Sequence, residues 1–295
     1  MLPRFRKRRF TLLDAILLAS LAILVGLAVH RIRTGLNYNW RWEVIPQFLF
    51  RRDQETGRLV SNVLVDGLVT TIRLSIWSAL LALVIGVAFG ILGMQRNRAF
   101  RLISRVYVTT VRNTPPLVLV FIFYFFVGNQ VTTALGIERW VANADDSTRA
   151  VIAVLFSDPR RFSEFLSAVM TLAVYEGAYM AEIIRAGVQS VHRGQWEAAY
   201  ALGLPKSDQF RFVILPQAFR TISPALAGQF ISTIKDSAIV AVISVQELTF
   251  QGLELMSATY RTFEVWITVT LLYFALTAAC SFLARLLERS MQTRY

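Results

Sequence analysis

The sequence predicts an all-α membrane protein that crosses the bilayer several times. Of its 295 residues, 55% are hydrophobic and only 17% are charged, whereas soluble domains average about a quarter charged residues. Several apolar runs also approach the roughly 20 residues that a helix needs to cross a bilayer. The chain has a single cysteine, Cys280, so no disulfide framework is expected.

The chain carries a formal net charge of +12, from 31 Lys and Arg against 19 Asp and Glu. In a soluble protein this excess would suggest a nucleic-acid partner. Here the basic residues cluster at the ends of apolar runs, where they set the orientation of the helices and meet anionic lipid. No polar domain is left over for nucleic acid, so we expect contact with membrane lipid and no nucleic-acid partner.

The apolar runs predict six spans, at residues 12–29, 66–94, 106–127, 166–184, 218–245 and 265–284. The basic run "RFRKRR" at 4–9 precedes the first span, and no small-residue cleavage site follows it. We therefore expect an uncleaved first span with a cytoplasmic N-terminus. Basic residues also mark the cytoplasmic segments, at 95–105, 193–211 and 285–295.

This topology predicts three parts of the chain. Residues 1–65 hold the basic N-terminus, the first span and a tryptophan-containing external loop, residues 66–290 form the main membrane domain, and 291–295 are a cytoplasmic tail. Residues 128–165 and 246–262 are expected outside the membrane, with a short apolar piece at 150–156 on the surface or re-entering it.

Two local patterns predict how the second and third spans pack. Small residues recur every four positions on one face of the second span, at Ser78, Ala82, Gly86 and Gly90, which lets another helix approach closely. In the third span, Pro115 and Pro116 each lack a backbone donor and disturb the helix. Carbonyls freed inside a membrane must face protein or a water-filled cavity.

Charged side chains inside the predicted spans are candidate solute contacts, because a charge at the bilayer centre costs about 2.5–3.5 kcal/mol. Glu176, in the middle of the fourth span, suits a substrate amino or guanidinium group. Lys235 and Asp236 form either a polar gate or a neutral pair that packs the bundle. Arg112 either lines a cavity or snorkels to the interface.

A further pair of charges is expected to be structural. Glu182 and Arg185 are three residues apart at the cytoplasmic end of the fourth span, so they can pair on one helix face.

The motifs of several enzyme classes are missing from the sequence. None of the three lysines follows a glycine, so there is no G-x-x-x-x-G-K-[ST] phosphate loop. The two histidines, His30 and His192, fall on opposite sides of the membrane and cannot share a metal. No G-x-S-x-G nucleophile elbow occurs. We therefore expect no catalytic residue, no metal site and no bound cofactor.

The segment 193–216, between the fourth and fifth spans, carries the most specific pattern in the chain. Three residues, Glu197-Ala198-Ala199, precede Gly203, and Leu215-Pro216 closes the segment. Trp196, Ala198, Ala199 and Leu202 are spaced to form an apolar ridge on a short helix that enters a partner's groove. Glu197 suits the first turn of that helix, Gly203 the turn that ends it, and Pro216 the entry to the next span.

This segment resembles the EAA signature of the integral membrane permease subunits of type I ABC importers. That signature reads E-A-A, three residues, G, nine residues, I-x-L-P, and here Val213 replaces the isoleucine. The stretches "VRNTPPLVLVFIFYF" and "IKDSAIVAVISVQELT" look like the polar amino acid subfamily. The resemblance covers about residues 66–290, and the external stretch 128–165 is longer than usual for the family.

The resemblance implies a five-helix permease core with one extra N-terminal helix, in a bacterial inner membrane. It implies a dimer of ATPase subunits that binds ATP, a second permease subunit, and a periplasmic or lipid-anchored binding protein that delivers a polar amino acid. The coupling residues carried over from the signature are Glu197, Ala198, Ala199, Gly203, Leu215 and Pro216.

Two alternatives remain open. The EAA segment couples transport of any substrate, so a permease for another small solute fits equally well. An ATP-independent channel or secondary carrier is the alternative from another class. Secondary carriers often contain inverted repeats and paired broken helices, and neither is evident here.

Overall fold

The computed structural model describes residues 12–35, 38–54 and 57–292, and these are mostly helical, which confirms the all-α fold class. Contacts divide the chain into two units, on either side of the Trp42–Glu43 bond. Each unit is described by itself.

The first unit contains helix α1 (Leu12–Gly35), which includes the predicted first span. Its described apolar part, Leu12–Leu24, is shorter than a full membrane crossing. Membrane crossing by α1 therefore stays a prediction. The basic run at 4–9 lies outside the described residues.

The second unit begins with a small folded segment where an external loop was predicted. A short helix, α2 (Ile45–Leu49), leads into an antiparallel hairpin of β1 (Phe50–Arg52) and β2 (Leu59–Ser61). Phe48 and Leu49 pack against a buried cluster at the start of the bundle.

The centre of the bundle is formed by α3 (Val63–Met94) and α9 (Phe162–Gln189), which pack along their length. The predicted small-residue stripe is buried in this contact. A Cβ atom added at Gly86 would lie 2.6 Å from the Cβ atom of Met180, closer than side chains allow. The prediction that this stripe admits a neighbouring helix is confirmed.

The two prolines break the chain between α4 (Arg98–Asn113) and α5 (Pro116–Ile122), as expected. The predicted third span, 106–127, is wrong at its start. The apolar segment that is long enough to cross a membrane is Pro116–Ala134. It joins α5 to a π-helical turn and to α6 (Asn129–Ala134). Residues before the break belong instead to α4, one side of which carries arginines.

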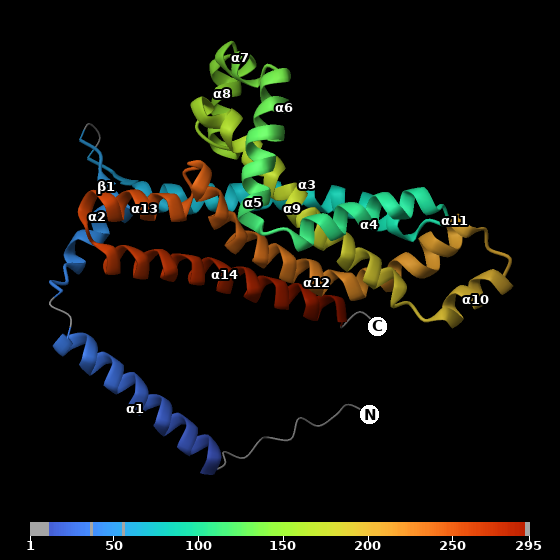
Figure 1. Ribbon diagram of the computed structural model, residues 1–295, viewed down its shortest axis with the longest axis horizontal. Helices are drawn as coiled ribbons and strands as arrows, with labels where there is room; N and C mark the ends of the chain where they lie inside the picture. The colour runs from blue at the N-terminus through green and yellow to red at the C-terminus, as the bar shows by residue number, and fades with distance from the viewer. Residues whose placement is uncertain (1–11, 36–37, 55–56, 293–295) are drawn as a thin grey trace. The chain divides into compact units, whose positions relative to one another are not determined.

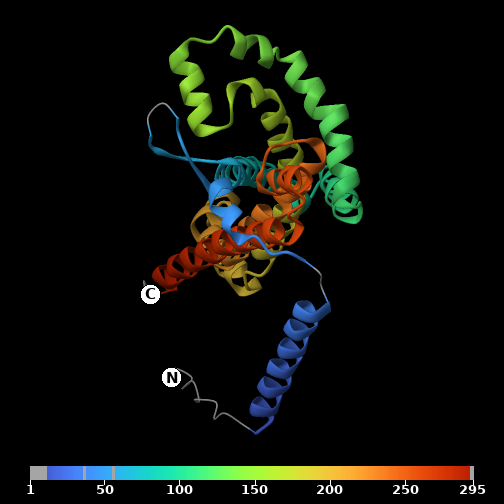
Figure 2. The same cartoon turned by 90° about the vertical axis from the view of Figure 1, so that its left-hand side faces the viewer.

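The stretch after α6, which was expected outside the membrane, is largely helical. It contains α7 (Ile137–Ala142), α8 (Asp146–Leu155) and a 3-10 turn at Pro159–Arg161. Both views show these helices standing away from α3 and α14 (Figures 1 and 2). The apolar piece at 150–156 is largely the end of α8, whose Val151, Val154 and Leu155 are exposed.

The remaining elements follow α9 in order: α10 (Arg193–Ala201), α11 (Lys206–Asp208), a π-helical turn (Gln209–Ile214), α12 (Leu215–Asp236), a 3-10 segment (Ser237–Ile243), α13 (Leu248–Thr259) and α14 (Thr262–Gln292). The predicted external loop 246–262 is therefore largely helical. The core joins α3, α5, α9 and the 3-10 segment around Leu74, Val120 and Leu172.

In the described part of the chain, four segments are long and apolar enough to cross a membrane: Val63–Met94, Pro116–Ala134, Lys206–Ile243 and Thr262–Leu286. Helix α9 is long, but Glu176, Glu182 and Arg185 make it less apolar. Its buried residues run along most of its length, since α3, α4 and α12 pack around it. The number of six spans stays a prediction.

Candidate functional site

Helix α10 lies at the end of the bundle where α9 ends and α12 begins (Figure 1). The His192 ring nitrogen Nδ1 accepts a bond from the Gly194 amide and caps its start. At its end, Gly203 has φ 72°, the left-handed conformation that glycine adopts most readily. The Gly203 amide donates to the carbonyl of Tyr200 and the Leu204 amide to that of Ala199, which is the Schellman arrangement. The predicted turn at Gly203 is confirmed.

The apolar ridge predicted on α10 is wrong in part. Ala199 is only 2% exposed, and Trp196 packs against the cluster around Ile184 and Ile214. These two side chains face the protein's own bundle. The helix exposes Leu202 and Tyr200 instead, at 79% and 77%.

Glu197 and Ala198 lie on the exposed side of α10. The placement of Glu197 in the first turn is wrong, because α10 begins at Arg193 and Glu197 falls in its second turn. Arg193 donates from Nε to Oε1 of Glu197 over 2.9 Å, and both side chains remain largely exposed. An exposed pair of this kind contributes little to stability, so Glu197 is accessible to a partner's basic side chain.

Side-chain amides tie α10 to the start of α12. Gln217 donates to Oε1 of Gln195 over 3.2 Å and to the Val213 carbonyl over 2.8 Å. Gln209 donates to the Leu204 carbonyl over 2.7 Å. These bonds connect the loop after α10 with the segment that leads into α12.

Leu215 and Pro216 open α12, and both are exposed. A π-helical turn, Gln209–Ile214, runs into α12 just before Pro216, and proline lacks the N–H that the interior of a helix normally uses. The helical segment is continuous from Lys206 to Ile243, so it begins ten residues before Pro216, and the prediction that Pro216 marks the entry into the next span is wrong.

Glu176 lies in the middle of α9 and is completely buried. Gln229 of α12 donates to its Oε2 atom over 2.6 Å, while Oε1 has no hydrogen-bond partner among the described residues. The carboxyl group of Asp236, at the end of α12, lies beside it. Two carboxyl groups this close repel each other when both are ionised, and a bound cationic donor would remove that repulsion.

Lys235 does not join this group. Its side chain is exposed, and among the described residues it forms no ion pair with Asp236. The structure thus brings Glu176 and Asp236 together, while Lys235 acts on Asp236 only through its charge and without a direct ion pair.

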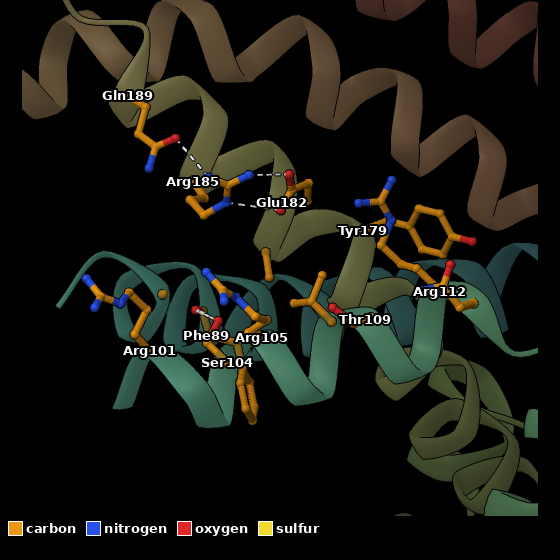
Figure 3. A pocket seen from close by; sticks show the side chains of 14 residues that line it. Phe89, Arg101, Ser104, Arg105, Thr109, Arg112, Tyr179, Glu182, Arg185 and Gln189 are labelled. Atoms are coloured by element: carbon orange, nitrogen blue, oxygen red, sulfur yellow. Dashed lines mark hydrogen bonds and ion pairs between the residues drawn. The ribbon is translucent and has the colours of Figure 1, made fainter. Parts of the chain in front are cut away.

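Arg112 lies elsewhere, on a cavity of about 660 Å³ between α4 and α9 (Figure 3). Its guanidinium carbon is 5.3 Å from the centre of the Tyr179 ring, within cation–π range. In the same cavity, Arg185 donates from Nε to Glu182 over 3.1 Å and from Nη1 to Gln189 over 2.8 Å. The predicted Glu182–Arg185 pair is confirmed.

Two further polar residues were missed by the sequence reasoning. Arg73, in α3, lines a cavity of about 380 Å³ together with Asp66, Arg161 and Glu164. The sequence did contain a signal for Arg73, since it is an arginine inside a predicted span.

The second is Glu247, which is fully buried at the start of α13. It accepts bonds from the amides of Thr249 and Phe250, each at 2.8 Å, and from the Tyr273 hydroxyl at 2.6 Å. Burial raises the pKa of the Glu247 carboxyl above its usual 4.5. No sequence signal marks it, because it lies in a stretch predicted to be an external loop.

Comparison with known sequences finds a matching family and similar transport proteins. A family described as "Binding-protein-dependent transport system inner membrane component" matches residues 82–293. The glutamine transport system permease protein GlnP of Escherichia coli K12 is 34% identical over 224 residues, which cover 75% of this chain and 90% of that protein. The arginine transport system permease protein ArtQ of Bacillus subtilis 168 is 30% identical, over 78% of this chain and 93% of that protein.

Solved structures share the fold. A chain in the crystal structure of an amino acid ABC transporter with histidines matches with a TM-score of 0.62 and 33% identity, over 77% of this chain and 94% of that one. A chain of the inward-facing MetNI methionine ABC transporter matches with a TM-score of 0.59 and 20% identity, over 77% and 95%. The second likeness concerns the fold alone.

Proposed function

This chain belongs to the family of binding-protein-dependent transport system inner membrane components, and on that premise we propose that it carries polar amino acids across the bacterial inner membrane. It is the permease subunit of an ABC importer, a class in which a separate ATPase drives transport. The similar glutamine and arginine permeases favour a polar amino acid as its solute.

The coupling surface that we propose is the exposed face of α10. Glu197 and Ala198 contact the ATPase, with Tyr200 and Leu202 beside them. Ala199 and Gly203 shape the helix from within. Leu215 and Pro216 lie at the point where movement of this loop passes into α12.

The partners follow from this role. Two ATPase subunits bind ATP, a second permease subunit completes the pathway, and a periplasmic or lipid-anchored binding protein delivers the solute. We expect both ends of the chain in the cytoplasm, because α10 must meet the ATPase there. The chain itself carries no ATPase site and needs no cofactor.

For the solute, we propose that Glu176 and Asp236 receive a positively charged group. The unpartnered Oε1 atom of Glu176 is the observation that supports this assignment. Arg112 lies on a separate cavity and Lys235 is exposed, so neither joins Glu176 in contacting the solute. A permease for another small solute would use the same coupling surface.

The observation that carries the coupling proposal is the accessible carboxylate on a well-anchored helix between α9 and α12. Glu197→Lys reverses this charge without touching the buried side of α10. We expect it to abolish uptake and to weaken co-purification of the ATPase, while the amount of permease in the membrane stays unchanged.

The matched control is Glu138→Lys, an equal charge change at an exposed position of α7, which should leave uptake normal. Normal uptake with Glu197→Lys would contradict the coupling surface. A carrier or channel would purify without any ATPase, which separates that alternative from an importer permease.

A further inference from the structure

The cavity between α4 and α9 carries an excess of positive charge. The only carboxylate among its lining residues is that of Glu182. Four arginines line the cavity: Arg101, Arg105, Arg112 and Arg185. Glu182 is engaged by Arg185. Among the described residues, none of the other three arginines forms an ion pair.

These three guanidinium groups lie on one face of α4, at residues 101, 105 and 112. Figure 3 shows Arg101 and Arg105 on the α4 side of the cavity, across from Arg185 and Glu182 on α9. Like charges four residues apart on a helix destabilise it, and the repulsion grows where the surroundings are less polar than water. A bound anion would remove this repulsion.

The donors of the cavity suit an oxyanion. Arginine presents a planar set of N–H donors that matches phosphate. The hydroxyl group of Thr109 also lines the cavity and forms no side-chain bond with the described residues. The Ser104 hydroxyl is engaged, because it donates to the Phe89 carbonyl over 2.7 Å.

The position of the cavity indicates where the anion comes from. The side of α4 next to the arginines exposes Leu102, Ile103 and Val106. Exposed apolar residues beside arginines on one helix are typical of a surface at the level of the lipid head groups. Arg101 also lines a cavity with Trp196 of α10, which places this end of α4 on the side of the coupling helix.

We propose that the cavity between α4 and α9 binds the head-group phosphate of an anionic phospholipid. Its acyl chains would lie along the exposed apolar side of α4. Basic pockets between membrane helices on the cytoplasmic side are a recognised setting for anionic lipid. This site is distinct from Glu176 and does not depend on which solute is transported.

A bound phosphate would bridge α4 to the last turns of α9, just before α9 leads into α10. The lipid would therefore hold in place the part of the bundle that receives the movement of the coupling helix. Uptake would then depend on the content of anionic lipid even where the solute and the binding protein are unchanged.

The test measures lipid binding to the full-length chain by native mass spectrometry in detergent, with added phosphatidylglycerol or phosphatidylcholine. We expect phosphatidylglycerol to bind at about one tight site and phosphatidylcholine to bind at least tenfold more weakly. Arg105→Gln removes one charge-assisted contact and should weaken phosphatidylglycerol binding about tenfold. Arg105→Lys keeps the charge but loses the planar set of N–H donors. Its affinity for phosphatidylglycerol should therefore lie between those of the wild type and Arg105→Gln.

The matched control is Arg96→Gln, the same charge change at an exposed position that does not line the cavity, and it should bind lipid like the wild type. Equal binding of both lipids would overturn the proposal. So would an equal loss with Arg96→Gln, which would indicate a diffuse surface charge. Thermal melting of each variant shows that a loss of binding is not a loss of folding.

Competition identifies the source of the anion. Inorganic phosphate should displace phosphatidylglycerol at high concentration, because both present the same oxyanion. Displacement by millimolar glutamine or arginine would assign the cavity to the solute pathway and overturn the lipid assignment. Binding of inorganic phosphate without binding of phosphatidylglycerol would overturn it as well.

Discussion

Glu176 and Glu247 are both completely buried carboxylates, but their surroundings give them different uses. Glu247 is fully engaged as the cap of α13, whereas one oxygen of Glu176 is left without a partner. A buried acceptor that is satisfied stabilises the fold, and one that is unsatisfied costs free energy unless a ligand fills it. The first is therefore structural, and the second is the candidate for solute contact.

Substitution of Glu176 tests that distinction. Glu176→Gln keeps the size and the acceptor oxygen but removes the charge, so uptake of cationic and zwitterionic amino acids should need about tenfold more solute, with the protein still present in the membrane. Uptake assays over a range of solute concentrations measure this. Glu254→Gln, at an exposed position of α13, is the control. Normal uptake of every solute by Glu176→Gln would refute the contact.

Substitution of Glu247 should change stability instead of transport. Glu247→Ala removes the cap of α13 and leaves the Tyr273 hydroxyl without its acceptor, which should lower the free energy of unfolding by about 2–4 kcal/mol. Glu247→Gln keeps an acceptor oxygen at the cap and should lose much less. Denaturation of the purified protein in detergent compares the two. Equal losses would show that the side-chain oxygen is not what stabilises this turn.

The raised pKa of Glu247 also fixes the direction of a pH effect. Because its pKa in the folded protein lies above its unfolded value of 4.5, its contribution to stability is fully present below pH 4.5 and is lost as the pH rises through the folded pKa. Glu247→Gln should therefore make the melting temperature less dependent on pH above 4.5. A melting curve whose pH dependence is the same as in the wild type would contradict this.

Among the elements, α3 and α9 show how small residues determine a helix contact. Gly86→Ala adds a Cβ atom 2.6 Å from Met180, and such overpacking should lower the free energy of unfolding by about 1–3 kcal/mol. Gly228 of α12 has open space around it, so Gly228→Ala should be neutral or stabilising by up to about 1 kcal/mol. Measurement of both variants separates close packing from the general effect of adding a methyl group.

The elements also show what the sequence could predict. The small-residue stripe, the break at Pro115 and Pro116 and the turn at Gly203 were predictable, because each depends on local chemistry. The start of the third span was placed too early, because Pro115 and Pro116 were taken as a disturbance inside a helix from residue 106, whereas they separate α4 from the apolar segment that begins at Pro116. The face of α10 was misjudged because the residues that pack on Trp196 belong to the flanking helices α9 and α12 and to the turn before α12, and their approach is set by tertiary folding.

At the scale of the whole molecule, the class of protein could be predicted from composition and from the EAA spacing, and the family match confirms it. The candidate solute site could be predicted only as separate charges. Helix packing decides that Glu176 meets Gln229 and Asp236 while Arg112 belongs to another cavity. Residues 53 positions apart, such as Glu176 and Gln229, carry no sign of this meeting in the sequence.

The orientation of the whole chain can be tested at its end. A phosphatase or fluorescent reporter fused after Tyr295 should report a cytoplasmic location, because the last predicted span is followed by basic residues. A fusion in the α7–α8 segment, after Asn143, should report the opposite side. The same location for both fusions would overturn the topology.

The anchoring of α10 has a consequence for how tightly the importer assembles. Trp196, the Schellman turn and the Gln195–Gln217 bond hold this helix in one conformation before any partner arrives. Little conformational entropy is then lost on docking, and preorganised surfaces bind with a higher affinity than flexible ones of the same area. Loosening α10 from within should therefore weaken the complex as effectively as altering the residues that touch the partner.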